Sequence, residues 1–321
     1  MARVNPTAKR NKSISRNLDL ETLGIEFSRF SGINNVSDPR DLGKKDLVEA
    51  PNMDIDNNGK AKRRTGYTKK LTPSGNVHSL WANDRICLFI DGSTLKRLFE
   101  DYTVSTIRSN VSSLPMDYVD LNEVVYYSSA SVNGYIKNGV DSAYVDSGLN
   151  YMEVPKKGQH IEYYNGRIYI AQNHDLWYTV GYTFESSLRI DMRNGVMPFK
   201  DEVTMIKAVD DGIYVSIGDI DDRSSIIFLG GQGPEDFIYK VVADYGAIEG
   251  TAVKPRSAFV GDGIDGTTVM WASRKGICLG ANGGRFTNLT AGRYEVTDNR
   301  YGAGYFRLRN GLPQYVATLW T

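Results

Sequence analysis

Histidine, cysteine and catalytic motifs are scarce in this sequence of 321 residues. The three histidines, His78, His160 and His174, form neither an HxxxH nor an HExxH motif, and no GxSxG segment occurs. The two cysteines, Cys87 and Cys278, lie in separate apolar runs, which favours buried free thiols over a disulfide and fits a reducing cytoplasm. The sequence therefore predicts no enzyme, no catalytic residue and no cofactor.

Long apolar runs are also missing. No run reaches the ~18 consecutive apolar residues that a membrane-spanning helix needs. The opening segment, MARVNPTAKRNKSISR, has no apolar stretch of the kind that a secretory signal carries. We therefore expect neither a membrane span nor a signal peptide.

Glycine and tyrosine are abundant, with 32 and 20 residues, and apolar residues make up 41% of the chain. Many turns joined by short aromatic segments are typical of β architecture with a sizeable core. Eleven tyrosines fall between residues 118 and 182. They could form a sugar-binding surface, but tyrosine in strands more often packs across the sheet, and we favour packing.

The charge is unevenly distributed although the formal net charge is zero. Residues 1–75 contain 15 Lys and Arg against 9 Asp and Glu, whereas the remainder contains 23 against 29. A basic N-terminal part is thus joined to an acidic body. Such a part could bind that body, an acidic neighbour or nucleic acid.

Residues 1–17 contain no acid and too few apolar residues to form a core. We predict a flexible arm that orders only on contact, although a solvated tail without a role explains the composition equally well. The candidate partner-contacting or DNA-contacting residues of this arm are Arg3, Lys9, Arg10, Lys12 and Arg16.

Residues 18–75 indicate an extended segment that ends in a basic hairpin. The stretch NMDIDNNGKAKRRTGY from Asn52 predicts a strand, an Asn-Asn-Gly turn and a second strand. Asp54–Gly59 also fits the first half of a calcium loop, but its twelfth position is Thr65 rather than Glu, so we favour the hairpin and expect no metal. The second strand could contact DNA phosphates or a partner, or its charges could merely discourage unwanted strand pairing. Its candidate contact residues are Lys60, Lys62, Arg63 and Arg64.

From about residue 76 a loose repeat of turn, apolar strand, turn and strand runs to the C-terminus. The turns recur near Asp84, Asn122, Asn165, Asp211 and Gly266, at spacings of 38, 43, 46 and 55 residues. That is close to the span of a four-stranded propeller blade. We therefore predict an all-β, β-propeller-like domain of about five to six blades over residues 76–321. A pair of β-sandwiches is the competing architecture.

Ring closure in a propeller often combines strands from both ends of the chain. The strand around Met53–Ile55 is a natural partner for Gln314–Trp320, and we expect the two to pair. Helical patterning is weak along the chain, and the stretch Glu235–Asp244 could hold a helical turn.

Carboxylates precede several of the predicted strands, but turn acids commonly cap backbone N–H groups, so catalysis by them is not favoured. The acidic loops Gly218–Asp222 and Gly261–Gly266 have nonspecific spacing, and solvated turns are favoured over calcium sites. The turn acids in question are Asp84, Asp120, Glu123 and Asp211.

A segment of about 40 residues, SGINNVSDPRDLGKKDLVEAPNMDIDNNGKAKRRTGY, resembles the opening of bacteriophage tail hub or nozzle proteins, including the packaged-DNA stabilisation proteins of short-tailed phages. The resemblance rests on a G-x-N-N element followed by A-x-N-x-D-x-x-x-x-G-x-x-x-x-R-x-G. The matching residues are Gly32, Asn34, Asn35, Ala50, Asn52, Asp54, Gly59, Arg64 and Gly66.

The resemblance implies a structural virion protein of the tail or head-to-tail connector, assembled in the host cytoplasm. It also implies a ring of copies, commonly sixfold in that family, that meets a portal or adaptor and other tail proteins and helps to retain and deliver packaged DNA. Replacing Arg63 and Arg64 with Glu is expected to block assembly while sparing the fold. The alternatives are a carbohydrate-binding or glycoside-hydrolase-like propeller used in host recognition, and a scaffold propeller that binds peptides.

Overall fold

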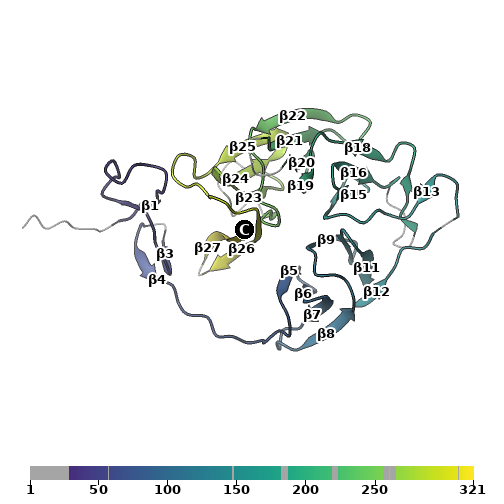
Figure 1. Cartoon of the computed structure of the whole chain (residues 1–321), viewed down its shortest axis with the longest axis horizontal. Coiled ribbons are helices and arrows are strands. Elements are labelled where there is room, and N and C mark those ends of the chain that lie inside the picture. Colours follow the sequence, from purple (N-terminus) through teal and green to yellow (C-terminus); the bar gives the residue numbers. More distant parts are fainter. Residues whose placement is uncertain are drawn as a thin grey trace, which may run out of the picture.

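The polypeptide forms a series of antiparallel β-sheets, arranged as blades around a common axis in a computed structural model (Figure 1). The structure describes residues 29–56, 58–146, 148–181, 187–218, 223–255, 260, 265–309 and 311–321. The arm residues Arg3, Lys9, Arg10, Lys12 and Arg16 lie outside these ranges, as do most of the two acidic loops.

Four of the blades have four antiparallel strands each, and the chain visits them in order. Blade 1 consists of β5 (Val77–Ala82), β6 (Cys87–Asp91), β7 (Thr94–Leu98) and β8 (Val104–Arg108). Blade 2 consists of β9 (Met116–Leu121), β10 (Val124–Ser129), β11 (Asn133–Lys137) and β12 (Val140–Ser142). Blade 3 consists of β14 (His160–Tyr164), β15 (Arg167–Gln172), β16 (Asp175–Tyr178) and β18 (Val196–Pro198). Blade 4 consists of β19 (Val203–Val209), β20 (Gly212–Ile217), β21 (Ser225–Gly230) and β22 (Ile238–Ala243).

The fifth blade has three strands and is followed by a long hairpin. Its strands are β23 (Val269–Ser273), β24 (Gly276–Ala281) and β25 (Arg285–Asn288), with the 3-10 turn η3 (Asn282–Gly284) before the last. The hairpin pairs β26 (Tyr301–Arg309) with β27 (Leu312–Trp320). Three small sheets complete the described chain: β1 (Gly32–Ile33) with β2 (Asp46–Leu47), β3 (Met53–Ile55) with β4 (Ala61–Arg63), and β13 (Met152–Glu153) with β17 (Ile190–Asp191).

The tight turns inside the blades follow from residues that tolerate positive φ. Asn165 and Gly166 have φ of 41° and 82° between β14 and β15, and Asn138 and Gly139 have 54° and 78° between β11 and β12. Two consecutive residues with positive φ give the turn whose twist matches that of the flanking strands. The Asn-Gly pairs therefore fix where each strand reverses.

Neighbouring blades bury their faces against each other, so the core is divided into successive interblade layers. Consecutive residues of one strand face opposite blades: Tyr127 packs with blade 1, and Tyr126 packs with blade 3. Blades 3 and 4 share another layer, and Trp271 of blade 5 packs with Tyr214 of blade 4. Burial of each large side chain contributes about 1.5–3 kcal/mol. A single blade could not hide both of its faces, and stacking is what stabilises the domain.

Ring closure differs from the sequence prediction. Met53–Ile55 pairs with β4, and Gln314–Trp320 pairs with β26, so these two strands do not pair with each other. Side chains connect them instead: Arg309 Nη1 lies 3.3 Å from Asp54 Oδ2. The predicted closure is therefore wrong, because each strand already has a hairpin partner close in sequence, which costs less loop entropy than a partner at the far end of the chain.

Two local predictions also need correction. The first four repeat turns lie between the first and second strands of blades 1 to 4, but Gly266 precedes β23, and the equivalent turn of blade 5 is at Arg274–Lys275. An insertion between β22 and β23 displaces the repeat. The stretch Glu235–Asp244 holds β22 rather than a helical turn, because pairing with β21 outweighs local preference.

The two cysteines are free thiols, as predicted, with Cys278 buried and Cys87 half-buried. The tyrosine prediction is also confirmed in the centre of the domain, where the buried examples are Tyr118, Tyr126, Tyr127, Tyr164 and Tyr169. In the part of the chain that the structure describes, no helix is long and apolar enough to cross a membrane.

Candidate functional site

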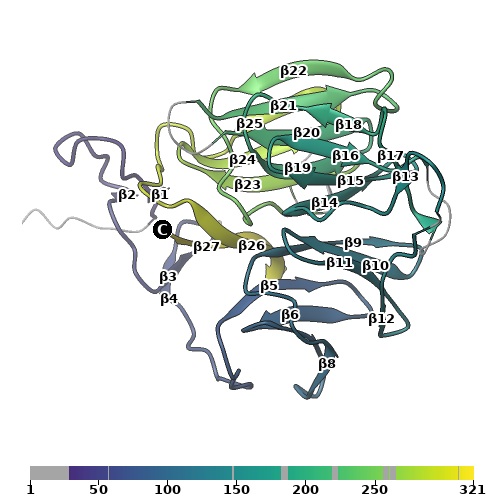
Figure 2. The ribbon, with the colours of Figure 1, turned by 45° about the vertical axis from the view of Figure 1, so that its right-hand side comes forward.

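The basic hairpin β3–β4 lies outside the propeller, beside the C-terminal hairpin (Figures 1 and 2). β3 and β4 pair with Met53 opposite Arg63 and Ile55 opposite Ala61, which confirms the predicted strand–turn–strand. All four candidate residues are exposed: Lys60, Lys62, Arg63 and Arg64. The structure therefore brings these four cations together on one small, protruding element.

Asp54 and Asp56 have separate roles within this hairpin. Asp54 accepts from Arg64 Nε at 3.0 Å and pairs with Arg309, so its charge is balanced by two guanidinium groups. Asp56 accepts the backbone N–H groups of Asn58 and Lys60, each at 2.9 Å. The Lys60 backbone bond is the largest cause that lowers the pKa of Asp56. Both carboxylates are engaged by the hairpin itself, and no group of three or more His, Cys, Asp or Glu residues in the described ranges is arranged to hold a metal ion.

An extended segment, residues 65–73, leads from the basic hairpin to blade 1, and we call it the strap. It follows the outside of the molecule in Figure 1 without joining a sheet. Residues 65–70 are all exposed, and Tyr67 retains 73% of its accessible surface. Among the described residues, no backbone–backbone hydrogen bond involves the strap. Its anchors are side chains: Arg309 donates to Thr65 Oγ1, Tyr67 is a hydrogen-bond partner of Arg307, and Lys70 Nζ lies 5.7 Å from the centroid of the Tyr102 ring.

A second cluster of charged residues lies at the propeller axis, on the first strands of the blades. Lys207 Nζ of β19 lies 3.0 Å from Asp117 Oδ2 of β9, which joins blade 4 to blade 2. Lys254 Nζ lies 2.8 Å from Glu162 Oε1 of β14, which joins the segment before blade 5 to blade 3. We call these four residues the axial ion pairs. They link parts of the ring that are not neighbours. In chain order, blade 3 lies between blades 2 and 4, and blade 4 lies between blade 3 and the fifth blade.

The pKa values of two groups in the axial cluster, Lys207 and Glu249, are shifted from their usual values. Burial lowers the pKa of the Lys207 ammonium, but the charges of Asp117 and Glu162 outweigh that effect, so its pKa lies above the usual value. Burial, followed by the carboxylates of Glu202 and Asp117, raises the pKa of Glu249 to about 7. The axial cluster therefore combines a lysine whose charged form is favoured with a carboxyl group, Glu249, whose pKa lies near neutral pH.

His160 faces Glu249 across the axis, with His160 Nε2 3.8 Å from Glu249 Oε1. Burial lowers the pKa of His160 to about 4. At pH 5 to 6 both groups are therefore neutral, and their contact is polar rather than ionic.

Sequence reasoning missed the axial cluster, although a signal was present. The first strands MDYVDL, HIEYY and VTMIKAV each carry a charged residue inside a mostly apolar or aromatic run, and MDYVDL carries a second acid, Asp120, near its turn; one charged residue of each strand reaches the axis. Those residues are Asp117, Glu162 and Lys207. Aligning the repeat copies on their turns would have placed the three charges on equivalent strands, and therefore around one axis.

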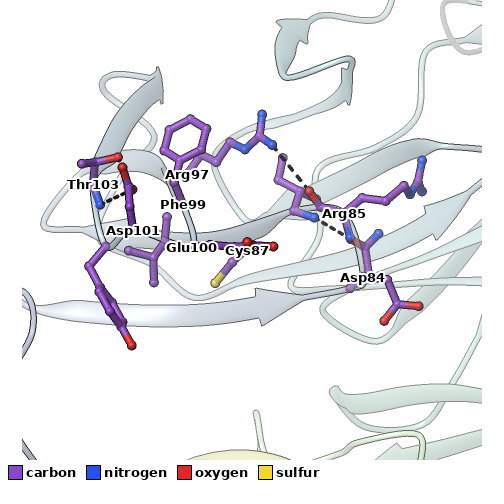
Figure 3. Close-up of a pocket in the computed structure, with 12 residues that line it drawn as sticks. Asp84, Arg85, Cys87, Arg97, Phe99, Glu100, Asp101 and Thr103 are labelled. Atoms are coloured by element: carbon purple, nitrogen blue, oxygen red, sulfur yellow. Dashed lines mark hydrogen bonds between the residues drawn. The ribbon is translucent and has the colours of Figure 1, made fainter.

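The hollow at the end of blade 1 has a volume of about 740 Å³ and is lined by the turns on either side of β6 and β7 (Figure 3). Its polar groups serve the local turns: Asp101 accepts from Thr103, and Asn83 accepts the backbone N–H of Arg85. Burial raises the pKa of the Cys87 thiol that lines it, which disfavours the thiolate. The hollow therefore shows turn chemistry and a thiol that is poorly suited to act as a nucleophile.

The four turn acids are distributed between two places. Asp120 accepts from Arg85 at 2.6 Å, where blades 1 and 2 meet. Asp84 lines the blade 1 hollow next to that arginine, and Glu123 lines the groove between the two blades. Asp211 instead accepts the backbone N–H of Gly283 at 2.7 Å, between blades 4 and 5. Two of the four thus form ordinary ion-pair or turn contacts, as the sequence favoured.

Comparison with known proteins identifies no family. No family model and no curated protein sequence matches the chain. A candidate 6-phosphogluconolactonase from Bacteroides uniformis is 12% identical over 82% of this chain and 80% of its own, with a TM-score of 0.49. The Neurospora crassa Pan2 WD40 domain is 10% identical over 74% of this chain and 73% of its own, with a TM-score of 0.43. The WD40 propeller domain of Doa1 is 12% identical over 77% of this chain and 84% of its own, with a TM-score of 0.46.

The arrangement of the sheets makes the chain a β-propeller. Four four-stranded antiparallel sheets and one three-stranded sheet pack around an axis, and these five blades of the described chain agree with the predicted five to six. At these identities and TM-scores the similar structures carry no argument about function. The function has to be argued from the basic hairpin, the strap and the axis.

Proposed function

We propose that this protein is a non-catalytic structural subunit of a bacteriophage tail or head-to-tail connector. The observation that carries the proposal is the exposed basic hairpin, which projects from a rigid propeller with four cations on one short element. A two-stranded hairpin that does not pack into a core has only marginal stability in water. A contact surface for a partner explains why the chain maintains one.

The charges of the hairpin suit a polyanionic or acidic partner. Lys60, Lys62 and Arg63 have no opposite charge within the described ion pairs, whereas Arg64 is paired with Asp54. Unpaired cations neutralise phosphates without reading a base sequence, and they also bind acidic protein surfaces. The proposed partners are other copies of the chain in a ring, a portal or adaptor and other tail proteins, with non-specific contact to packaged DNA.

The axial ion pairs bear on where DNA would pass. Asp117–Lys207 connects blades 2 and 4 of one copy, and Glu162–Lys254 connects blade 3 to the segment before blade 5. A duplex about 20 Å wide could not pass along an axis that such 3 Å contacts cross. In the proposed assembly the channel is therefore enclosed by a ring of copies, and each propeller forms part of its wall.

The test is a double charge reversal in the full chain, Lys62→Glu with Arg63→Glu. Arg64 is left unchanged because its pairing with Asp54 belongs to the hairpin itself. The matched control is Lys44→Glu with Lys45→Glu, which reverses two exposed charges elsewhere in the N-terminal part. We expect the first variant to fold but to give no particles in a phage complementation assay, and the control to give normal particles. Normal particles from the first variant would refute the proposal.

The carbohydrate hypothesis receives less support from the structure. Its main motivation was the tyrosine-rich stretch, and the central tyrosines are buried between blades rather than displayed. A glycan array separates the two functions directly. A reproducible hit that disappears on replacing an exposed tyrosine, such as Tyr151, would favour the receptor-binding alternative.

A further inference from the structure

The outer strand of blade 4, β22, is an unprotected sheet edge. It is six residues long and pairs on one side only, with β21. Ile238, Tyr239 and Val241 remain 73%, 54% and 66% exposed. An edge strand presents a row of backbone N–H and C=O groups without partners, and a long apolar edge is a template for another strand.

The usual protection against strand addition is weak here. Proteins often place an outward-pointing lysine or a proline on an edge. The single lysine of β22, Lys240, instead donates to the carbonyl of Gly284 at 3.3 Å, which draws its charge toward blade 5. The outer strand of blade 3, by contrast, contains Pro198. β22 thus differs from its neighbour in being open to pairing.

Acidic side chains stand at both ends of β22. Glu235 precedes it with 69% of its side chain exposed, and Asp244 follows it with 84% exposed. Their contacts, with Arg167 at 3.2 Å and Lys275 at 3.5 Å, are solvent-accessible and therefore weak. A strand with cations near its ends would complement this edge.

The strap of this chain has the required properties. It is extended, its backbone is unpaired among the described residues, and it contains the β-favouring residues Thr65, Tyr67 and Thr68. Arg63 lies just before it, and Lys69 and Lys70 lie in its second half. Nine residues extend about 30 Å, which exceeds the roughly 20 Å of a six-residue strand. Pro73, which has no N–H group to donate, ends the segment that can pair.

We propose that the strap of one copy pairs as an additional strand with β22 of a second copy. The strap and β22 lie on opposite sides of one molecule (Figures 1 and 2), so a copy cannot satisfy its own edge. The contact is heterologous, with different surfaces on the two partners, and its repetition gives a ring if the rotation closes and a filament if it does not. The inference rests on the proposed function, which makes the protein a subunit of an assembly, and it adds which two surfaces form the contact between copies.

The first test compares two valine substitutions by light scattering on the full chain. Val241→Lys places a charge on β22, and Val140→Lys places the same charge on the outer strand of blade 2, where the valine is 64% exposed. We expect Val241→Lys to reduce the assembled wild-type mass to the 35.8 kDa of one chain, and Val140→Lys to leave the assembly unchanged. Ile238→Lys is a second edge variant, expected to behave like Val241→Lys.

The second test identifies the strap as the partner. One variant reverses the charges of the strap, Lys69→Glu with Lys70→Glu, and another reverses the charges at the ends of β22, Glu235→Lys with Asp244→Lys. Each variant alone should fail to assemble. Mixing the two proteins should restore the assembly, because the reversed charges complement each other. Tyr67→Cys in one copy and Tyr239→Cys in another, both with Cys87→Ser, should form a cross-linked dimer with a short bis-maleimide only when mixed.

The outcomes separate this inference from the proposed function. Assemblies that survive Val241→Lys and Ile238→Lys, or the absence of a mixed cross-link, would overturn the strap–β22 interface while leaving a structural subunit in place. A wild-type protein that stays at 35.8 kDa at all concentrations, alone and with virion partners, would overturn both.

Discussion

Replacing Asp117 with Asn tests whether the axial ion pairs stabilise the propeller. The change is isosteric. It removes the charge that Lys207 faces at 3.0 Å, and it leaves one oxygen for the backbone N–H groups of Tyr118 and Ile161, which Asp117 accepts with its two oxygens. Removing one partner of a buried pair costs about 3–5 kcal/mol, because the other charge stays buried without compensation. The side chains retain 14% exposure at Lys207 and 22% at Asp117, so water offsets part of that cost and we expect about 2–3 kcal/mol.

The corresponding shift in melting temperature follows from the size of the chain. With about 2.1 cal/mol/K of unfolding entropy per residue, a loss of about 2–3 kcal/mol lowers the Tm of 321 residues by about 3–5 °C. Differential scanning calorimetry at pH 7 measures it. The control is Asp38→Asn, which breaks an exposed pair with Arg40, whose side chains are 41% and 88% exposed, and should shift the Tm by less than about 1 °C.

A double variant sharpens the argument. Asp117→Leu with Lys207→Met replaces the pair by apolar side chains of similar size, which is often neutral or stabilising for a buried pair. We expect it to recover most of the stability that Asp117→Asn loses. Equal melting temperatures for Asp117→Asn and Asp38→Asn would refute the claim that the axis depends on this pair.

Three further predictions concern titration, packing and hydrogen bonding. The pKa of Glu249 is raised from 4.5 to about 7, so the stability that its protonation supplies is present below pH 4.5 and is lost as the pH rises through 7. In thermal unfolding, Glu249→Gln should therefore have the same free energy of unfolding as wild type at pH 4.5 and a free energy of unfolding about 3 kcal/mol higher at pH 8. A Cβ at Gly158 would lie 2.1 Å from a backbone oxygen of β15, whereas one at Gly66 meets open space, so urea unfolding should show a loss of about 3 kcal/mol for Gly158→Ala and almost none for Gly66→Ala. Tyr127→Phe deletes the hydroxyl that donates to Asp141 at 2.6 Å and should cost about 1–2 kcal/mol in the same assay, and no loss would show that the bond contributes nothing net.

The blades could be predicted from the sequence because their signals are local. Asn-Gly turns with positive φ and short apolar strands repeat at similar spacing, and every pairing inside a blade joins segments close in sequence. The closure and the insertion before β23 depend on competition between distant segments. The sequence periodicity does not indicate whether a strand pairs with its hairpin neighbour or with a distant strand. For this reason the pairing of Met53–Ile55 with Gln314–Trp320 was predicted wrongly.

The candidate site shows the same division. The hairpin charges Lys60 and Lys62 could be located because strand and turn chemistry place them directly. The axial partners could not, since Asp117 and Lys207 are 90 residues apart and meet only because two blades face each other across the axis. β22 was missed for a different reason: a strand that is exposed on both sides has no apolar alternation to reveal it.

In the part of the chain that the structure describes, the N-terminal segment and the C-terminal hairpin share no sheet, and this has a mechanical consequence. The contacts between the N-terminal segment and the C-terminal region include two ion pairs, Asp46–Arg293 and Asp54–Arg309, the hydrogen bond of Arg309 to Thr65 and the hydrogen bonds of Asn35. Such contacts break one at a time and weaken with ionic strength, unlike a β-ladder, which yields cooperatively. A load on the N-terminal part would therefore release it as a tether while the blades stay folded, and the salt concentration would set the force at which it lets go.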